Sequence, residues 1–325
     1  MNQSRDALIA LAVIVGVPLV LTGWVFLSER LIKPLGRKAR NRVRPWLWLA
    51  PGALIILVVL IFPFLVTLRY SVGDSNGEGF VGFDNFSWAV TQPDNLKAIG
   101  NTIAWILILP IAVLAIGLVF AVLADRVRYE RVAKGIVMIP SVFSLVVGSV
   151  VWGLVYRYSP PGATPTGLAN AIYTGVTGNP PLAWLIDANV NNVALMVIGL
   201  WMWLGFAMLL ISAGIKGVPM EFIEAARIDG ANEFQIFRDI TFRQLIPTLL
   251  VVLTTLTVWA LKVFDIVYVM TTGRYGTAVL GTRVYEELFN ADQFGRGSAL
   301  VILMILITVP IMLVNIWRNR QEEIK

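Results

Sequence analysis

The sequence predicts an all-α polytopic membrane protein with about seven transmembrane helices. The chain is 57% hydrophobic and 14% charged, and its mean hydropathy is +0.76, which is well above the usual range of water-soluble proteins. Several apolar stretches reach the roughly 20 residues that a helix needs to cross a hydrocarbon core about 30 Å thick. Uninterrupted stretches of this length are typical of membrane helices and not of the short alternating strands of a membrane barrel.

Seven stretches are long and apolar enough to be membrane-spanning helices. Six of them contain no charged residue, whereas the sixth in chain order contains Lys262 and Asp265. All seven are separated by connections that carry the polar and charged residues of the chain. The predicted spans are residues 7–27, 46–68, 102–124, 136–156, 193–213, 246–270 and 298–317.

The first predicted span has the position of a secretory signal peptide. Its apolar run is longer than the hydrophobic region of such a peptide, and only one basic residue, Arg5, precedes it. It ends in the sequence WVFLSER, which offers no A-x-A-like cleavage site. We therefore expect residues 7–27 to remain as a transmembrane helix.

The basic residues are unevenly distributed among the connections. Most of the 26 Lys and Arg residues follow the first, third, fifth and seventh spans, and the densest group lies between Arg30 and Arg44. Because cytoplasmic loops of membrane proteins carry an excess of Lys and Arg, this bias predicts an external amino terminus and a cytoplasmic carboxyl terminus. The net charge of +6 is then explained by topology and contact with anionic lipid, and not by a nucleic-acid partner.

The connections predicted to lie outside are rich in Gly, Pro, Asn and Thr, as in SPPGATPTG and TGNPP. They cover roughly residues 69–101, 157–192 and 271–297. We expect ordered loops with short helices, long enough to meet an external partner.

One polar connection, residues 216–244, is amphipathic rather than uniformly hydrophilic. Pro219 precedes a helical stretch, Asp229 and Gly230 form a strong turn signal, and a second helical stretch covers residues 232–242. The sequence therefore predicts a helix, a tight turn and a second helix at the inner face of the membrane. Two interpretations remain open: an interfacial helix that packs on the bundle, or a surface that docks against another protein.

The segment EAARIDGANEFQIFRDITF in this connection resembles the EAA loop of permease subunits of binding-protein-dependent ABC importers. That loop has the pattern Glu-Ala-Ala, three residues, Gly, nine residues, Ile, any residue, Leu-Pro. Phe242 and Arg243 replace the Leu and the Pro, and a proline follows only at Pro247, so the exit of the second helix is left open. The matching positions are Glu224, Ala225, Ala226, Gly230 and Ile240.

Further segments resemble the carbohydrate branch of this superfamily. WLAPGALIILVVLIFPFLVTLRYS is similar to an early span with a proline near its exit, FVGFDNF to an outer loop, and LKVFDIVYVMTTG to a sixth-span signature. That signature usually continues with Gly-Gly-Pro, whereas this chain has GRYGTAV, which resembles the α-glucoside permeases, as does QFGRGSA before the last span. The resemblance implies transport of a di- or oligosaccharide such as an α-glucoside, maltose or trehalose.

The resemblance implies a type I ABC importer permease-like bundle and a division of labour among subunits. An external sugar-binding protein delivers the solute, this chain and a second permease subunit form the path in a prokaryotic cell membrane, and two cytoplasmic ATPase subunits drive it. The chain itself is then not an enzyme and holds no cofactor or metal, because ATP and magnesium bind the partner ATPase. The residues implied to contact the ATPase are Glu224, Ala225, Ala226, Asp229, Gly230, Phe234 and Ile240.

The same resemblance predicts how the chain divides into parts. The part that matches the core of such permeases contains the EAA loop and most of the predicted spans. The predicted parts are an amino-terminal transmembrane helix with a basic cytoplasmic linker at 1–45, a second transmembrane helix with an outer loop at 46–97, a core permease domain at 98–317 with the EAA loop at 214–247, and a cytoplasmic tail at 318–325.

The two charges within the sixth predicted span need an explanation, because an ionised group at the bilayer centre costs about 2.5–3.5 kcal/mol on insertion scales. The spacing of Lys262 and Asp265 places them on one helical face, where they can pair, and Lys262 is close enough to the outer surface to snorkel. Lining of a wet cavity is the other interpretation. Trp259, on the same face, suits either a sugar site or an interfacial anchor, and Trp201 and Trp203 in the fifth span share that ambiguity.

Two other classes of function fit the sequence less well. A secondary transporter or channel would have Lys262 and Asp265 as its only obvious coupling charges, and the inverted repeats or broken helices common in such proteins are not evident. A membrane enzyme would have to act without His or Cys, both of which are absent, and without a recognisable set of carboxylates. No phosphate loop of the form G-x-x-x-x-G-K-S/T occurs, so ATP hydrolysis must come from a partner.

Overall fold

The computed structural model describes residues 16, 18–20, 22–125, 127–160, 162–163 and 167–322, with side chains up to residue 310. Much of the first predicted span therefore lies outside the described residues. The chain divides into two compact units, Met1–Arg69 and Tyr70–Lys325. The predicted four-part division of the chain stays a prediction.

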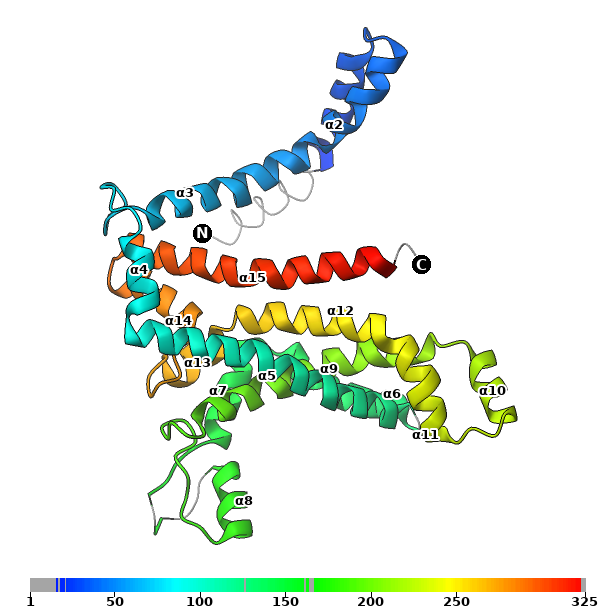
Figure 1. The fold of residues 1–325 in the computed structure, drawn as a ribbon, viewed down its shortest axis with the longest axis vertical. Coiled ribbons are helices and arrows are strands. Elements are labelled where there is room, and N and C mark those ends of the chain that lie inside the picture. The colour runs from blue at the N-terminus through cyan, green and yellow to red at the C-terminus, as the bar shows by residue number, and fades with distance from the viewer. Residues whose placement is uncertain are drawn as a thin grey trace, which may run out of the picture. The chain divides into compact units, whose positions relative to one another are not determined.

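Within the described part of the first unit, one helix is long and apolar enough to cross a membrane. It runs as α2 (Arg37–Ile56), a π-helical turn η1 (Leu57–Ile61) and α3 (Phe62–Ser71), which ends just beyond the unit boundary (Figure 1). None of the residues in its most apolar 18-residue window is buried. A helix with apolar side chains exposed on all sides is typical of contact with lipid.

The second unit is a helical bundle built around two long helices, α5 (Pro93–Ala124) and α9 (Asn191–Lys216), which lie side by side (Figure 1). Helices α12 (Phe242–Leu261) and α6 (Glu130–Val142) pack against this pair. Its core is formed by apolar side chains of α5, α9 and α12, among them Trp105, Leu109, Leu195, Met202, Met208, Leu245, Val252 and Leu256.

Small residues let these helices approach closely. A Cβ atom on Gly117 of α5 would lie 3.1 Å from the Cβ of Ala207 on α9, and one on Gly205 would lie 2.7 Å from the backbone oxygen of Val137 on α6. Membrane helices depend on such close contacts, because lipid offers no hydrophobic driving force for their association. The positions of α5 and α6 are therefore closely fixed against α9.

Two of the predicted spans are broken in the structure. Residues 136–156 form no single helix, because α6 ends at Val142 and α7 (Leu145–Val155) follows after a bend of 101°. Residues 246–270 are also divided, since α12 ends at Leu261 and α13 (Asp265–Thr271) begins a new helix. Prediction of two continuous helices here was wrong.

The all-helical membrane fold itself is confirmed. Among the described residues, four helices are long and apolar enough to cross a membrane, or five if the bent pair counts as one span. The last predicted span lies within α15 (Phe294–Glu322). The apolar part of this helix whose side chains are described, Phe294–Pro310, is shorter than the helices counted as spans. No strand forms in the described ranges, where a single isolated bridge joins Gly73 and Phe80.

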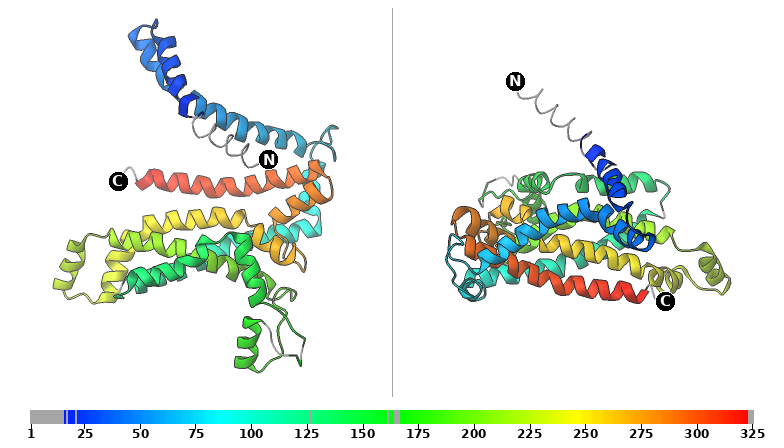
Figure 2. Two further views of the ribbon diagram at one scale, coloured as in Figure 1. Left: turned by 180° about the vertical axis from the view of Figure 1, so that it is seen from behind. Right: turned by 90° about the horizontal axis from the view of Figure 1, so that it is seen from above.

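The two ends of the bundle carry different elements (Figures 1 and 2). At one end lie α10 (Met220–Ile228) and α11 (Glu233–Ile236), near the last turns of α5 and α9. The connections predicted to lie outside contain short helices at or toward the other end, so the predicted short helices are confirmed in the described residues. These are α4 (Asp84–Thr91), α8 (Leu168–Thr177), α14 (Leu280–Tyr285) and the π-helical turn η3 (Glu286–Asn290).

Candidate functional site

Helix α10 protrudes from the bundle. Pro219 precedes its first residue, and none of its nine residues is buried. Most of its large apolar side chains are exposed as well, among them Phe222 at 52% and Ile228 at 86% of their accessible surface. The structure therefore disfavours the interpretation that this helix packs on the bundle, and leaves an amphipathic helix available to another surface.

The turn after α10 is closed by backbone hydrogen bonds. The amide of Ala231 donates to the carbonyl of Ala226 at 2.9 Å, and the amide of Gly230 donates to the carbonyl of Arg227 at 3.1 Å. This pair of bonds is the Schellman motif, which requires a left-handed residue, and Gly230 has φ of 83°. The sequence prediction of a tight turn at Asp229 and Gly230 is confirmed.

The second helix is fixed at its start by a capping box. The Asn232 side chain accepts from the amide of Gln235 at 2.9 Å, and the Gln235 side chain accepts from the amide of Asn232 at 2.8 Å. An ion pair of 2.9 Å between Arg227 and Glu233 also joins the two helices across the turn. These bonds make the loop a structured element that can keep one orientation relative to the bundle.

The exit of the second helix is continuous. Helix α11 passes into a π-helical turn η2 (Phe237–Thr241) and then into α12 without a break. Arg243, in place of the proline of the resembled pattern, keeps the amide that a regular helix needs, whereas Pro247 is accommodated inside α12. The two residues of this second helix that were predicted to contact the ATPase differ in exposure. Phe234 is 69% exposed, whereas Ile240 is half-buried.

A cavity of about 400 Å³ lies at the bend between α6 and α7. The rings of Trp203 and Trp259 line it with their centroids 5.6 Å apart, and Phe206 lies 4.8 Å from Trp259. Two hydroxyl groups, of Ser141 and Ser144, flank the bend. Aromatic walls with a few polar groups are typical of small-molecule sites. The other lining residues are Met138, Phe143, Leu145, Met202 and Leu209.

The predicted pairing of Lys262 with Asp265 is not found. Lys262 follows the last residue of α12 and Asp265 is the first residue of α13, so the two do not share a helical face. No ion pair joins them in the part of the chain that the structure describes, and neither lines the cavity beside Trp259. Lys262 is exposed and Asp265 is half-buried at a helix amino terminus, where a carboxylate is favourable.

Trp201 and Trp203 face different surroundings. On α9 a spacing of two residues separates side chains by more than half a turn, so the two rings diverge. Trp201 contacts Trp152 on α7, with centroids 5.9 Å apart in an edge-to-face arrangement. Of the residues predicted to line a path, the structure brings together Trp203 and Trp259, and it separates Trp201, Lys262 and Asp265 from them.

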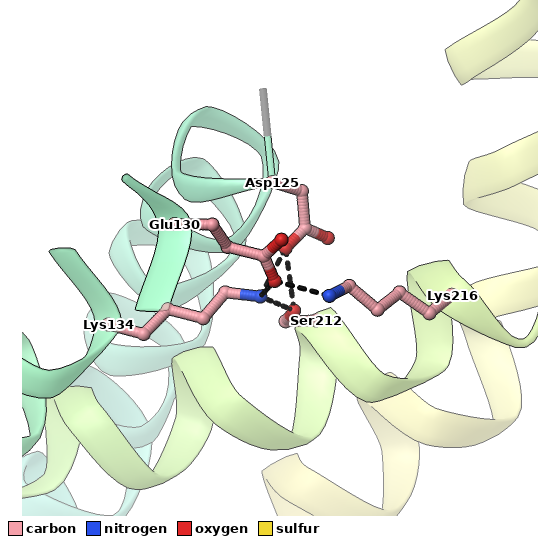
Figure 3. Close-up of polar contacts among 5 residues, drawn as sticks. All are labelled: Asp125, Glu130, Lys134, Ser212 and Lys216. Atoms are coloured by element: carbon pink, nitrogen blue, oxygen red, sulfur yellow. Dashed lines mark hydrogen bonds and ion pairs between the residues drawn. The ribbon is translucent and has the colours of Figure 1, made fainter. Parts of the chain in front are cut away.

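A cluster of charged residues at the end of the bundle that carries α10 was not predicted (Figure 3). Lys134 binds Asp125, Glu130 and Ser212, and Lys216 binds Glu130. In the sequence, both lysines belong to the basic connections that predict the topology. The available signal was the spacing of four between Glu130 and Lys134 on one helix, which is a common ion-pair spacing and does not indicate burial.

Comparison with known proteins agrees with this architecture. Residues 97–321 match the family described as the inner membrane component of binding-protein-dependent transport systems. The chain is 44% identical to the osmoprotective compounds uptake permease protein GgtC of Synechocystis over 85% of this chain and 99% of the relative. It is 38% identical to the alpha-glucoside transport system permease protein AglF of Rhizobium meliloti over 92% and 90% of the two chains.

A solved structure has the same fold. A chain of a bacterial alginate ABC transporter, in complex with a periplasmic protein bound to an alginate pentasaccharide, superposes with a TM-score of 0.74. The two chains are 20% identical, and the match covers 87% of this chain and 96% of the other. The likeness confirms the predicted importer-like bundle, and the family match confirms the resemblance drawn from the EAA spacing. This chain belongs to the family of binding-protein-dependent transport system inner membrane components, the permease subunits of ABC importers.

Proposed function

We propose that the chain is one of two permease subunits of an ABC importer that carries a di- or oligosaccharide across a prokaryotic cell membrane. The observation that carries this proposal is α10, an amphipathic helix without a buried residue, held by a rigid turn at one end of the bundle. The sugar class is supported by the names of relatives, which include the alpha-glucoside permease of Rhizobium meliloti and a trehalose/maltose permease of Thermococcus litoralis.

The ATPase subunits bind α10 in this proposal. Glu224, Ala225 and Ala226 lie on a helix that is open to a partner, and the small alanine side chains allow close approach. Because the Schellman turn and the capping box hold the two helices together, movement of a bound ATPase is transmitted to the bundle instead of being absorbed by a flexible loop. ATP and magnesium remain in the partner, and the chain contributes no catalytic group.

The position of α10 between α9 and α12 connects it to the cavity. Helix α9 carries Trp203 and leads into the loop, while α12 carries Trp259 and leads out of it. Trp203 lies 13 residues before Lys216, or about 20 Å along the helix. A motion that displaces α9 relative to α12 therefore changes the separation of the two rings that line the cavity.

The orientation in the membrane follows the charge distribution. The end of the bundle with α10 carries Lys216, Arg227 and Arg238, together with Lys134. The excess of basic residues supports a cytoplasmic position for this end, on the side of the ATPase subunits, with the opposite end facing the sugar-binding protein. The carboxyl terminus is cytoplasmic and the amino terminus is external.

Reconstitution tests the function directly. The chain is purified with its second permease and ATPase subunits, placed in proteoliposomes, and supplied with sugar-loaded binding protein and ATP. We expect uptake of labelled maltose, trehalose or another α-glucoside that requires ATP and the binding protein together. Uptake driven by an ion gradient without ATP would instead establish a secondary transporter and overturn the proposal.

The cavity tryptophans are proposed to stack against a sugar ring. Trp259→Ala removes one wall of the cavity, and the loss of an aromatic contact of about 1.4 kcal/mol corresponds to roughly a tenfold lower uptake rate at saturating binding protein. Trp201→Ala is the matched control, because the same side chain is removed from α9 outside the cavity. Equal effects of the two substitutions would contradict the assignment.

Lys262 and Asp265 are proposed to act at the outer part of the path, at the break between α12 and α13. Asp265→Ala is expected to change the relative uptake of different disaccharides severalfold without affecting the recovery of the ATPase subunits, since it lies far along the chain from α10. Co-purification and competition uptake measure the two effects. Loss of subunit assembly in this variant would indicate a purely structural role.

A further inference from the structure

The charged cluster of Asp125, Glu130, Lys134, Ser212 and Lys216 joins three segments of the chain (Figure 3). Asp125 follows α5, Glu130 and Lys134 lie in the first turns of α6, and Ser212 and Lys216 lie in the last turns of α9. Its bonds include a 2.6 Å ion pair of Lys134 with Glu130 and a 2.8 Å hydrogen bond from Ser212 to Asp125. The cluster therefore fixes the ends of the three helices to one another.

Stability does not explain this arrangement well. The side chains of Lys134 and Asp125 are only 11% and 13% exposed, so both charges have lost most of their hydration. Apolar residues of similar size commonly replace such buried pairs without loss of stability. Moreover, Oδ2 of Asp125 is buried and makes no hydrogen bond in the described part of the chain. A geometric role accounts better for these residues.

One side of the cluster is the junction with the proposed coupling helix. Lys216 is the last residue of α9, and only Gly217, Val218 and Pro219 separate it from α10. Its ammonium group binds Glu130 on α6. Any displacement of the α9–α10 junction therefore acts on the start of α6.

The other side of the cluster leads to the cavity. Ser141, in the last turn of α6, lines the cavity seven residues beyond Lys134, or about 10 Å along the helix. The close approach of Gly205 to the backbone of α6 at Val137 prevents α6 from moving freely relative to α9. Helix α6 is thus a short rod between the charged cluster and the cavity wall.

We propose that Lys134 is a positioning residue that transmits movement of α10, through the charged cluster and α6, to the bend that lines the cavity. The cluster makes the α6 bend follow the ATPase-bound loop. This inference rests on the proposed function, since it assumes that α10 receives the motion of an ATPase. If Lys134 only stabilised the fold, a well-packed apolar replacement would leave transport unchanged. If Lys134 transmits movement, the same replacement uncouples transport from ATP hydrolysis.

The test is the double substitution Asp125→Leu/Lys134→Met in the complete reconstituted complex. The two apolar side chains fill a similar volume, so we expect assembly, thermal stability and binding-protein-stimulated ATP hydrolysis to be kept. The ratio of sugar imported to ATP hydrolysed is expected to fall at least tenfold. Lys134→Arg, which keeps the charge, is expected to retain the wild-type ratio.

Two further variants separate a role of the cluster in transmission from a general effect of removing ion pairs. Lys216→Met removes the bond to the junction from a side chain that is 56% exposed, so folding is preserved, and the ratio is expected to fall about threefold. Glu29→Leu/Arg44→Met removes a 2.7 Å ion pair in the first unit and is expected to leave the ratio unchanged.

An unchanged ratio in both the double variant and Lys216→Met would overturn the inference. Uptake and ATP hydrolysis that fall in parallel, together with lower thermal stability, would also overturn it in favour of a structural role. The proposed function fails separately, because in that case the wild-type complex itself shows no ATP-dependent uptake.

Discussion

Replacement of Gly230 by valine is expected to abolish most sugar uptake while the protein remains inserted and folded. Gly230 has φ of 83°, and a β-branched residue held in that region costs about 1–3 kcal/mol. The cap and the exposed Arg227–Glu233 ion pair contribute about 1 kcal/mol each or less, so the turn rearranges rather than remains strained. A cost of this size lowers the fraction of molecules whose loop keeps its native orientation by roughly 5–150-fold.

Gly230→Asn is the matched control for this substitution. A Cβ at this position would meet no atom within 4 Å, so steric crowding is not the cause of any loss. Asparagine tolerates the left-handed conformation, and its variant is expected to keep most of the uptake. Uptake and membrane yield are measured side by side. Equal activity of the valine and asparagine variants would show that the turn is not required.

Local signals in the sequence sufficed to predict this loop. Pro219 before the helix, Gly230 in the turn and Asn232 at the next helix start each act over a few residues, and the structure contains the first helix, the turn and the start of the second helix that were predicted there. Of these three positions, Gly230 also belongs to the family pattern. For this reason the loop could be located without knowledge of what packs around it.

The broken spans could not be predicted in the same way. Hydropathy measures whether a stretch is apolar and not its direction, so the bend after Val142 lies within a run that is apolar on both sides. At the second break, the charges of Lys262 and Asp265 indicate that the apolar span is interrupted. Because one continuous helix was assumed there, the two charges were predicted to form an ion pair. Broken helices therefore do not distinguish this family from secondary transporters.

The charged cluster could not be predicted from the sequence for a different reason. Ser212 and Asp125 are 87 residues apart, and only the packing of α9 against α5 and α6 brings them together. Lysines near predicted helix ends are counted as exposed topology markers, although Lys134 is buried at 9% exposure. Such a network becomes visible only with the positions of three helices.

Charge reversal at Glu224 is expected to release the ATPase subunits without any effect on the fold. Glu224 is exposed on α10 and makes no hydrogen bond or ion pair within the described part of the chain. The substitution Glu224→Lys therefore leaves internal contacts intact, and any large effect must arise at a partner. Truncation of one member of a buried charged contact costs about 2–5 kcal/mol, so binding of the ATPase should weaken by more than about tenfold.

Co-purification from membranes and ATP-dependent uptake measure this effect together. Glu78→Lys is the matched control, because Glu78 is also exposed but lies in the connection predicted to face outside, before α4. The control is expected to retain the ATPase subunits in full. If Glu224→Lys also retained them and transported normally, α10 would not be the docking helix. Loss in Glu224→Lys alone would place the ATPase at this helix, because the two substitutions change the net charge of the chain equally.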